Sequence, residues 1–135
     1  SNGDLLNLLV LNGYLPVIAC VAGDRHGHIY NVNADQMAVA CASGFRADKL
    51  FFLTDVDGVK GPNGLLSVLN PSQCAQLIRD GIATGGMQAK LNAACDGLSH
   101  GIREVVIIPG ARENVVASCL AGQEIGTRLV LESAE

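Results

Sequence analysis

The feature of this sequence that most constrains its fold is the alternation of short apolar runs with segments of helical periodicity. The mainly apolar, strand-like runs lie at 15–21, 49–53, 105–108 and 127–131, and the helical patterns at 5–11, 33–44, 71–80, 86–100 and 113–120. Strands that alternate with helices favour a mostly parallel sheet covered by helices. We therefore predict the α/β class, in the form of a three-layer αβα sandwich with a mostly parallel central sheet.

The hydrophobic content bears on how the chain divides into domains. Hydrophobic residues occupy 49% of the 135 positions, and neither an internal repeat nor a linker-like stretch interrupts them. A chain of this length buries about two-thirds of the surface it exposes when unfolded, so apolar packing suffices without disulfides or a structural metal. We expect a single domain over residues 1–135.

Charge and cysteine usage exclude several classes of partner. The formal net charge is −4 and no basic run occurs, so no nucleic-acid partner is expected. No apolar stretch approaches the roughly 20 residues that span a bilayer, so no membrane partner is expected either. The five cysteines are widely spaced and form no Cys-x-x-Cys pair. This usage favours buried free thiols in a reducing cytoplasm.

The first candidate site is the polar segment Tyr30-Asn31-Val32-Asn33-Ala34-Asp35, which stands where a strand-like run becomes a helix. Such junctions collect ligands in α/β proteins. Asn31 carries a donor and an acceptor for a substrate amide or carboxylate, and Asp35 can hold lysine ammonium groups. A structural role is the alternative, because Asn33 is a good N-cap and Asp35 in the first turn suits the helix dipole.

The second candidate is the loop Thr54-Asp55-Val56-Asp57-Gly58-Val59, which follows a predicted strand. Ligands of open α/β sheets bind beyond the carboxyl ends of strands, and a glycine lets the backbone approach a nucleotide closely. A calcium loop is excluded, because it requires glycine at its sixth position and a carboxylate at its twelfth, and neither is present. A surface turn rich in aspartate is the remaining alternative.

The third candidate is the glycine pair in Thr84-Gly85-Gly86-Met87-Gln88-Ala89-Lys90, at the predicted start of a helix. Unpaired N–H groups at a helix start favour anions, and Lys90 lies one turn further on, where it can reach a transferring phosphoryl group. A solvated surface lysine is the alternative. Neither the Gly-x-x-x-x-Gly-Lys phosphate loop nor the Gly-x-Gly-x-x-Gly dinucleotide motif occurs. We interpret His26 and His28 as solvated turn residues and predict no protein metal site.

Taken together, four motifs resemble the C-terminal half of the acetylglutamate kinases of the amino acid kinase family. They are Tyr30-Asn31-Val32-Asn33-Ala34-Asp35, Leu53-Thr54-Asp55-Val56-Asp57-Gly58-Val59, Gly85-Gly86-Met87-Gln88-Ala89-Lys90 and Gly126-Thr127. Each motif is weak alone, but four in the family's order and approximate spacing are specific. The likeness runs from about Gly13 onward and implies the family's αβα sandwich, with ATP bound mainly through this half.

The resemblance also implies an activity and roles for residues. In that family ATP, with Mg²⁺, phosphorylates the side-chain carboxylate of N-acetyl-L-glutamate to an acyl phosphate for arginine biosynthesis, in a homo-oligomeric enzyme. By resemblance, Asn31 contacts the acetylated amino acid, Asp35 orients catalytic lysines and Lys90 stabilises the transition state. The same resemblance lines the nucleotide pocket with Asp55, Val56, Asp57, Gly58, Val59, Lys60, Ile82, Ala83, Thr84 and Met87.

The sequence departs from the family pattern in one large respect. The N-terminal half, with its glycine-rich phosphate loop, a second catalytic lysine and most of the amino acid site, is not in these 135 residues. We therefore expect the chain to supply the nucleotide site without completing catalysis alone. Two alternatives stay open. One is a related kinase of acetylaminoadipate, glutamate, carbamate or a nucleotide monophosphate, and the other is a regulatory module that binds nucleotide without transferring phosphate.

Overall fold

The central sheet has the predicted α/β character. The computed structural model describes residues 3–132, and its largest sheet has the strand order β3-β7-β8-β6. These strands are β3 (Lys49–Thr54), β7 (Glu104–Pro109), β8 (Thr127–Leu129) and β6 (Val68–Leu69). β3 pairs with β7 and β6 with β8 in parallel, whereas β7 and β8 are antiparallel. Most of the pairing is therefore parallel, as predicted.

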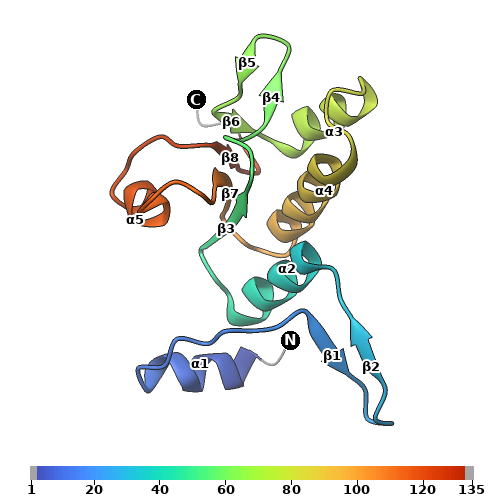
Figure 1. The fold of residues 1–135 in the computed structure, drawn as a ribbon, viewed down its shortest axis with the longest axis vertical. Helices are drawn as coiled ribbons and strands as arrows, with labels where there is room; N and C mark the ends of the chain where they lie inside the picture. Colours follow the sequence, from blue (N-terminus) through green and yellow to red (C-terminus); the bar gives the residue numbers. More distant parts are fainter. Residues whose placement is uncertain (1–2, 133–135) are drawn as a thin grey trace.

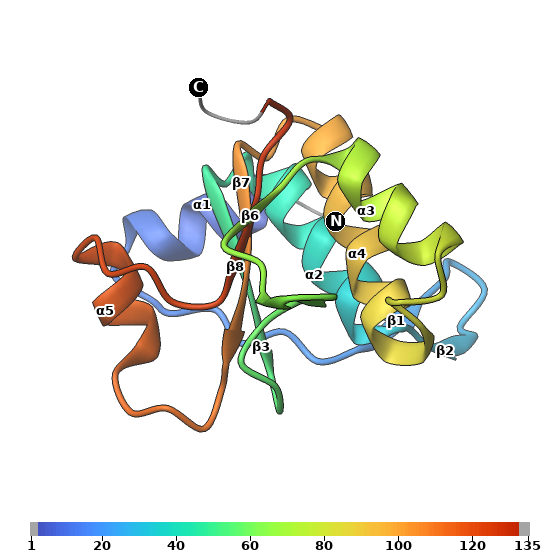
Figure 2. The ribbon, with the colours of Figure 1, turned by 90° about the horizontal axis from the view of Figure 1, so that it is seen from above.

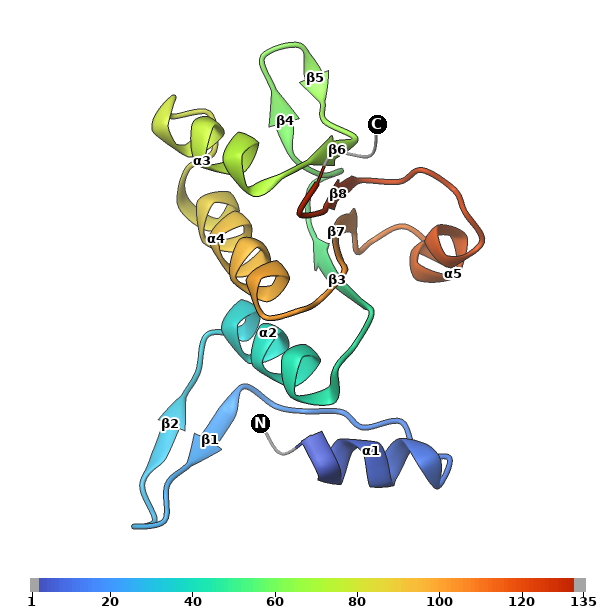
Figure 3. The same ribbon diagram turned by 180° about the vertical axis from the view of Figure 1, so that it is seen from behind.

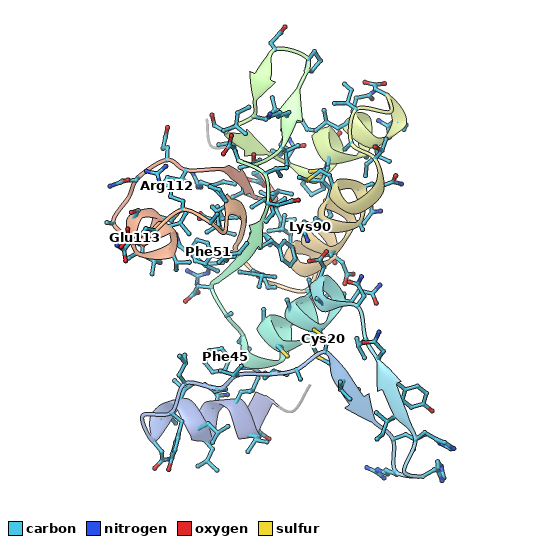
Figure 4. All side chains as sticks on the ribbon, viewed as in Figure 1. Cys20, Phe45, Phe51, Lys90, Arg112 and Glu113 are labelled. Carbon is cyan, nitrogen blue, oxygen red and sulfur yellow. The ribbon has the colours of Figure 1, made fainter. Side chains whose placement is uncertain are left out.

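Helices lie on both faces of this sheet. α2 (Ala34–Phe45), α3 (Pro71–Arg79) and α4 (Gly85–Ser99) cover one face, and the short α5 (Val115–Leu120) covers the other (Figures 1 and 2). Side chains of a strand alternate between faces, so Phe52 joins the core beneath the three helices while Phe51 joins the core beneath α5. Figure 4 shows Phe51 on the α5 side of β3. The predicted three-layer sandwich is confirmed.

The starts of two helices are fixed by side-chain caps. The Asn33 side chain accepts from the backbone N–H groups of Asp35 and Gln36 at the start of α2. At the start of α3, Asn70 and Gln73 form a capping box, and Pro71 occupies the first turn. These local signals explain why both helices begin where the sequence predicts.

The strand predicted at 15–21 is wrong over most of its length. Only Val21 belongs to a strand, in the hairpin of β1 (Val21–Gly23) and β2 (Ile29–Asn31) that follows the predicted helix α1 (Gly3–Leu11). A strand requires a partner for its backbone N–H and C=O groups, and within residues 3–132 the sheet does not reach residues 15–20. Leu15 and Val17 are accordingly 88% and 92% exposed.

The loop predicted after β3 contains a small hairpin. β4 (Lys60–Gly61) and β5 (Gly64–Leu65) pair antiparallel and project from the end of the molecule opposite α1 and the β1–β2 hairpin (Figure 3).

The strand predicted at 127–131 ends at Leu129. All five cysteines are free, as expected, although Cys74 alone of the five is buried. Over residues 3–132 no helix is both long and apolar enough to cross a membrane.

Candidate functional site

An ion pair between two helices is the centre of the candidate site. Asp35 lies in the first turn of α2, and Lys90 lies in the second turn of α4, 55 residues later. The Lys90 Nζ donates to both carboxylate oxygens of Asp35, at 2.9 and 3.0 Å. Their side chains are only 24% and 16% exposed, respectively, so the pair is shielded from much of the solvent that would weaken it.

An aromatic ring also holds the Lys90 ammonium group. Nζ lies 5.7 Å from the centre of the Phe52 ring, and Phe52 is a buried residue of β3. The negative face of an aromatic ring attracts a cation at this distance. Because Phe52 stands two residues before the end of β3, the ammonium group is held near the carboxyl end of that strand. Figure 4 shows Lys90 between α4 and β3.

The two asparagines of the first motif have different positions. Asn33 Oδ1 caps α2, with bonds of 3.0 Å from the N–H of Asp35 and 3.2 Å from that of Gln36. This cap fixes the first turn of α2 and with it the carboxylate of Asp35. Asn31 lies in β2, where its backbone pairs with Val21, and the residue is exposed. The structural alternative therefore applies to Asn33, whereas Asn31 is accessible to a ligand.

The loop after β3 combines exposed and buried residues. Asp55, Val56 and Asp57 are exposed, whereas Gly58 and Val59 are buried and Lys60 is exposed again. The Thr54 hydroxyl accepts from the Val56 N–H at 2.9 Å, which shapes the turn locally. The loop therefore has an accessible tip on a buried base.

The segment between α3 and α4 is held by backbone hydrogen bonds. The N–H groups of Ile82 and Ala83 both donate to the Leu77 carbonyl, at 3.0 and 3.1 Å. Ala83 is buried, whereas Ile82 and Thr84 are exposed and Met87 packs against the core. Thr84 is the N-cap of α4 and makes no side-chain cap bond there.

The start of α4 is open. A Cβ atom added at Gly85 or Gly86 would meet no heavy atom within 4 Å. Gly85 has φ 54°, a conformation that glycine adopts without strain. The first N–H groups of a helix have no intrahelical acceptors and carry a partial positive charge. Lys90 follows in the second turn of the same helix.

The predicted residues are thus brought together in part. Asp35 and Lys90 are in direct contact, and Phe52 links Lys90 to the strand from which the Asp55–Lys60 loop departs. A separate cavity of about 330 Å³ between α2 and α4 is lined by Gln36, Val39, Ala40, Ser43, Ala93, Asp96 and His100 and includes no predicted site residue. The roles given to the predicted residues remain predictions.

Two other polar features belong to this description. His26 and His28 are exposed, as expected, and His28 Nδ1 lies 2.8 Å from a carboxylate oxygen of Asp24. Hydrogen bonds from His28 and Tyr30 lower the pKa of Asp24 to about 2. Among residues 3–132 there is no group of three His, Cys, Asp or Glu side chains arranged for a metal ion.

One polar residue was underestimated from the sequence. From the sequence, Thr127 has no assigned role beyond its place in the Gly126-Thr127 motif, yet its side chain is 0% exposed and accepts a hydrogen bond from the Val59 N–H at the base of the Asp55–Lys60 loop. The available signal was a hydroxyl at the first position of a predicted strand, directly after a glycine. Its partners are more than 60 residues away in the chain, which is why spacing did not reveal them.

Comparison with known proteins identifies the family to which this chain belongs. A model of the amino acid kinase family matches residues 1–109, and the chain belongs to that family. The chain is 61% identical over 131 residues to the acetylglutamate kinase of Solibacter usitatus (strain Ellin6076), covering 96% of this chain and 51% of that protein. It is 43% identical over 128 residues to the acetylglutamate kinase of Allorhizobium ampelinum (strain ATCC BAA-846 / DSM 112012 / S4), covering 93% and 43% respectively. The resemblance found in the motifs is confirmed, and the chain spans about half the length of these relatives.

Solved structures share the fold at lower sequence identity. N-acetylglutamate synthase from Neisseria gonorrhoeae, complexed with coenzyme A and L-arginine, superposes with a TM-score of 0.91 at 24% identity, over 98% of this chain and 31% of that one. Carbamate kinase from Giardia lamblia gives a TM-score of 0.73 at 22% identity, over 97% and 48%. At these identities the likeness establishes the fold alone.

Proposed function

We propose that this chain supplies the nucleotide site of an acetylglutamate kinase. The reaction is the transfer of the γ-phosphoryl group of ATP to the side-chain carboxylate of N-acetyl-L-glutamate. A carboxylate oxygen forms a bond to the γ-phosphorus while the bond from that phosphorus to the β,γ-bridging oxygen breaks. The products are an acyl phosphate and ADP. We place this reaction in arginine biosynthesis and in the cytoplasm, and the complete protein in a homo-oligomer.

The observation that carries the proposal is the shielded Lys90–Asp35 pair, whose lysine lies in the second turn of a helix with an open start. An in-line transfer between two anions depends on positioning and positive charge more than on a covalent nucleophile. In the proposal the Lys90 ammonium group binds the γ-phosphate of ATP and stabilises the charge that develops on its oxygens during the transfer. Asp35 holds the ammonium group in place by accepting two hydrogen bonds from it, and the face of the Phe52 ring attracts it.

The remaining predicted residues bind the two substrates. Asn31, exposed on β2, would contact the acetylated amino acid. The nucleotide would lie along the Asp55–Lys60 loop and the Ile82–Thr84 segment, with Met87 beneath it. Mg²⁺ would enter with ATP as part of the co-substrate, coordinated by phosphate oxygens as it prefers, and we name no protein ligand for it.

Isothermal titration calorimetry of Mg²⁺–ATP into the 135-residue chain tests the nucleotide site. Lys90→Ala removes the donor to the phosphates, and because a hydrogen bond to a charged group is worth about 1.5–3 kcal/mol, affinity should fall about 10- to 150-fold. Lys49→Ala is the matched control, because Lys49 is a half-exposed lysine paired with Glu104 near the other end of β3. Equal affinities for wild type and Lys90→Ala would count decisively against the proposal.

A product assay separates the proposal from its alternatives. The complete protein should form acyl phosphate, trapped as a hydroxamate, from N-acetylglutamate in preference to acetylaminoadipate, glutamate, carbamate or a nucleotide monophosphate. We expect the 135-residue chain alone to form none. Binding of ATP without any product by the complete protein would support a regulatory module instead.

A further inference from the structure

Thr127 stands out as a buried hydroxyl in an apolar core. It is the first residue of β8, its relative exposure is 0%, and it is the one buried polar residue among residues 3–132. A buried hydroxyl loses its hydrogen bonds to water, so it is retained at little cost only where protein groups replace them. Thr127 has two such partners, and both belong to the segment that follows β3.

The Thr127 hydroxyl joins the two ends of that segment. Oγ1 accepts from the Val59 N–H at 2.9 Å and donates to the Leu66 carbonyl at 2.6 Å. The Leu66 N–H in turn donates to the Val59 carbonyl at 2.8 Å. The three residues form a closed set of hydrogen bonds beneath the β4–β5 hairpin. The base of the Asp55–Lys60 loop is thereby fastened to the central sheet.

Two glycines allow this close approach of backbones. A Cβ added at Gly58, where φ is 148°, would lie 2.8 Å from Thr127 Oγ1 and 3.2 Å from the carbonyl carbon of Gly126. A Cβ added at Gly126, where φ is 72°, would collide with the Ile107 carbonyl oxygen. Only glycine fits either position without displacing its neighbours. The residues around Thr127 are therefore shaped so that its hydroxyl reaches the loop.

We propose that Thr127 is a positioning residue that holds the Asp55–Lys60 loop in the shape that receives the nucleotide. The inference rests on the proposed function, because it is that proposal which places the nucleotide on this loop. Thr127 itself is too deeply buried to contact a ligand. Thr127 acts by accepting the hydrogen bond from the Val59 N–H. Val59 follows Gly58 directly and lies two residues after the exposed Asp57, so this bond fixes the backbone close to the exposed part of the loop.

The test compares three variants of the 135-residue chain by amide hydrogen exchange and by Mg²⁺–ATP titration. Thr127→Val keeps the shape of the side chain and removes the hydroxyl. Thr127→Ser keeps the hydroxyl and loses the methyl group. Ser43→Ala is the matched control, because the Ser43 hydroxyl oxygen is shielded from solvent, within a partly buried residue, and has no hydrogen-bond partner.

We expect the wild-type Val59 amide to exchange as slowly as the amides of β7. In Thr127→Val its exchange under native conditions should accelerate about tenfold or more, since a net hydrogen bond is lost from the site. ATP affinity should fall by a similar factor of about ten. Thr127→Ser should return both values to within about threefold of wild type, and Ser43→Ala should change neither. Rescue by serine would not follow if Thr127 served only to fill space.

Three results would overturn the inference. One is a wild-type Val59 amide that shows no protection from hydrogen exchange. This result would show that Thr127 does not hold the loop, even if Thr127→Val fails to fold. Another is equal Val59 exchange in wild type and Thr127→Val. The third is faster Val59 exchange in Thr127→Val with ATP affinity unchanged. A wild-type chain that binds no ATP would instead overturn the proposed function, and the Val59 measurements would still decide whether Thr127 holds the loop.

Discussion

The Lys90–Asp35 pair offers a quantitative test of the site's electrostatics. At their separation of 2.9 Å, two unit charges attract by about 6 kcal/mol at an effective dielectric constant of 20. Desolvation of both groups offsets much of this attraction. Exposed pairs contribute up to about 1 kcal/mol, and loss of one partner from a fully buried pair costs about 3–5 kcal/mol. With side chains 24% and 16% exposed, we expect a coupling of about 1–3 kcal/mol, between these limits.

A double-mutant cycle measures this coupling. Lys90→Met, Asp35→Asn and the double variant are unfolded in urea beside the wild type, and the coupling is the deviation of their free energies of unfolding from additivity. We expect Asp35→Asn to destabilise the chain more than Lys90→Met. The reason is that a lone carboxylate keeps its favourable position at the N-terminus of α2, whereas a lone ammonium group keeps only the Phe52 ring.

The Arg103–Asp48 pair provides the exposed control for that cycle. It has a single contact of 3.5 Å, and its side chains are 84% and 77% exposed. Its coupling should be under about 1 kcal/mol, and 1 M NaCl should weaken it proportionally more than the Lys90–Asp35 coupling, because screening acts on exposed charges. A Lys90–Asp35 coupling no larger than that of the control, or one equally sensitive to salt, would refute this account of a shielded pair.

Two further predictions concern backbone strain and pH. Gly126→Ala should lower the free energy of unfolding by about 2 kcal/mol or more, because the new Cβ collides with the Ile107 carbonyl oxygen and φ is unfavourable for alanine. Urea unfolding measures this loss. The control is Gly122→Ala, where φ is 95° but no atom lies near the added Cβ. Asp24 should titrate near pH 2 by NMR, and His28→Ala should return its pKa towards 3.8. Because the folded pKa is depressed, the carboxylate's stabilisation of the hairpin is present above about pH 4 and is lost as pH falls through 2. Equal stabilities of the two alanine variants, or an Asp24 pKa unmoved by His28→Ala, would contradict these accounts.

Local sequence signals predicted the starts of helices well. Asn33 and Asn70 provide caps through atoms within three residues of themselves, so each cap is encoded by its own neighbourhood. The apolar run at 15–21 carried an equally clear local signal for a strand, yet the strand predicted there was wrong except at Val21. A strand forms only where another strand pairs with it, and composition does not identify that partner.

The candidate site shows the same division. The sequence by itself determined the α/β class, the family motifs, and Asp35 and Lys90 as candidates, because periodicity, caps and motif order are properties of nearby residues. Only the tertiary structure decided that Asp35 meets Lys90 across 55 residues, that Phe52 lies under the ammonium group, and that Thr127 fastens a loop 68 residues before it. Such contacts depend on how the helices pack on the sheet, and that packing is a property of the whole chain.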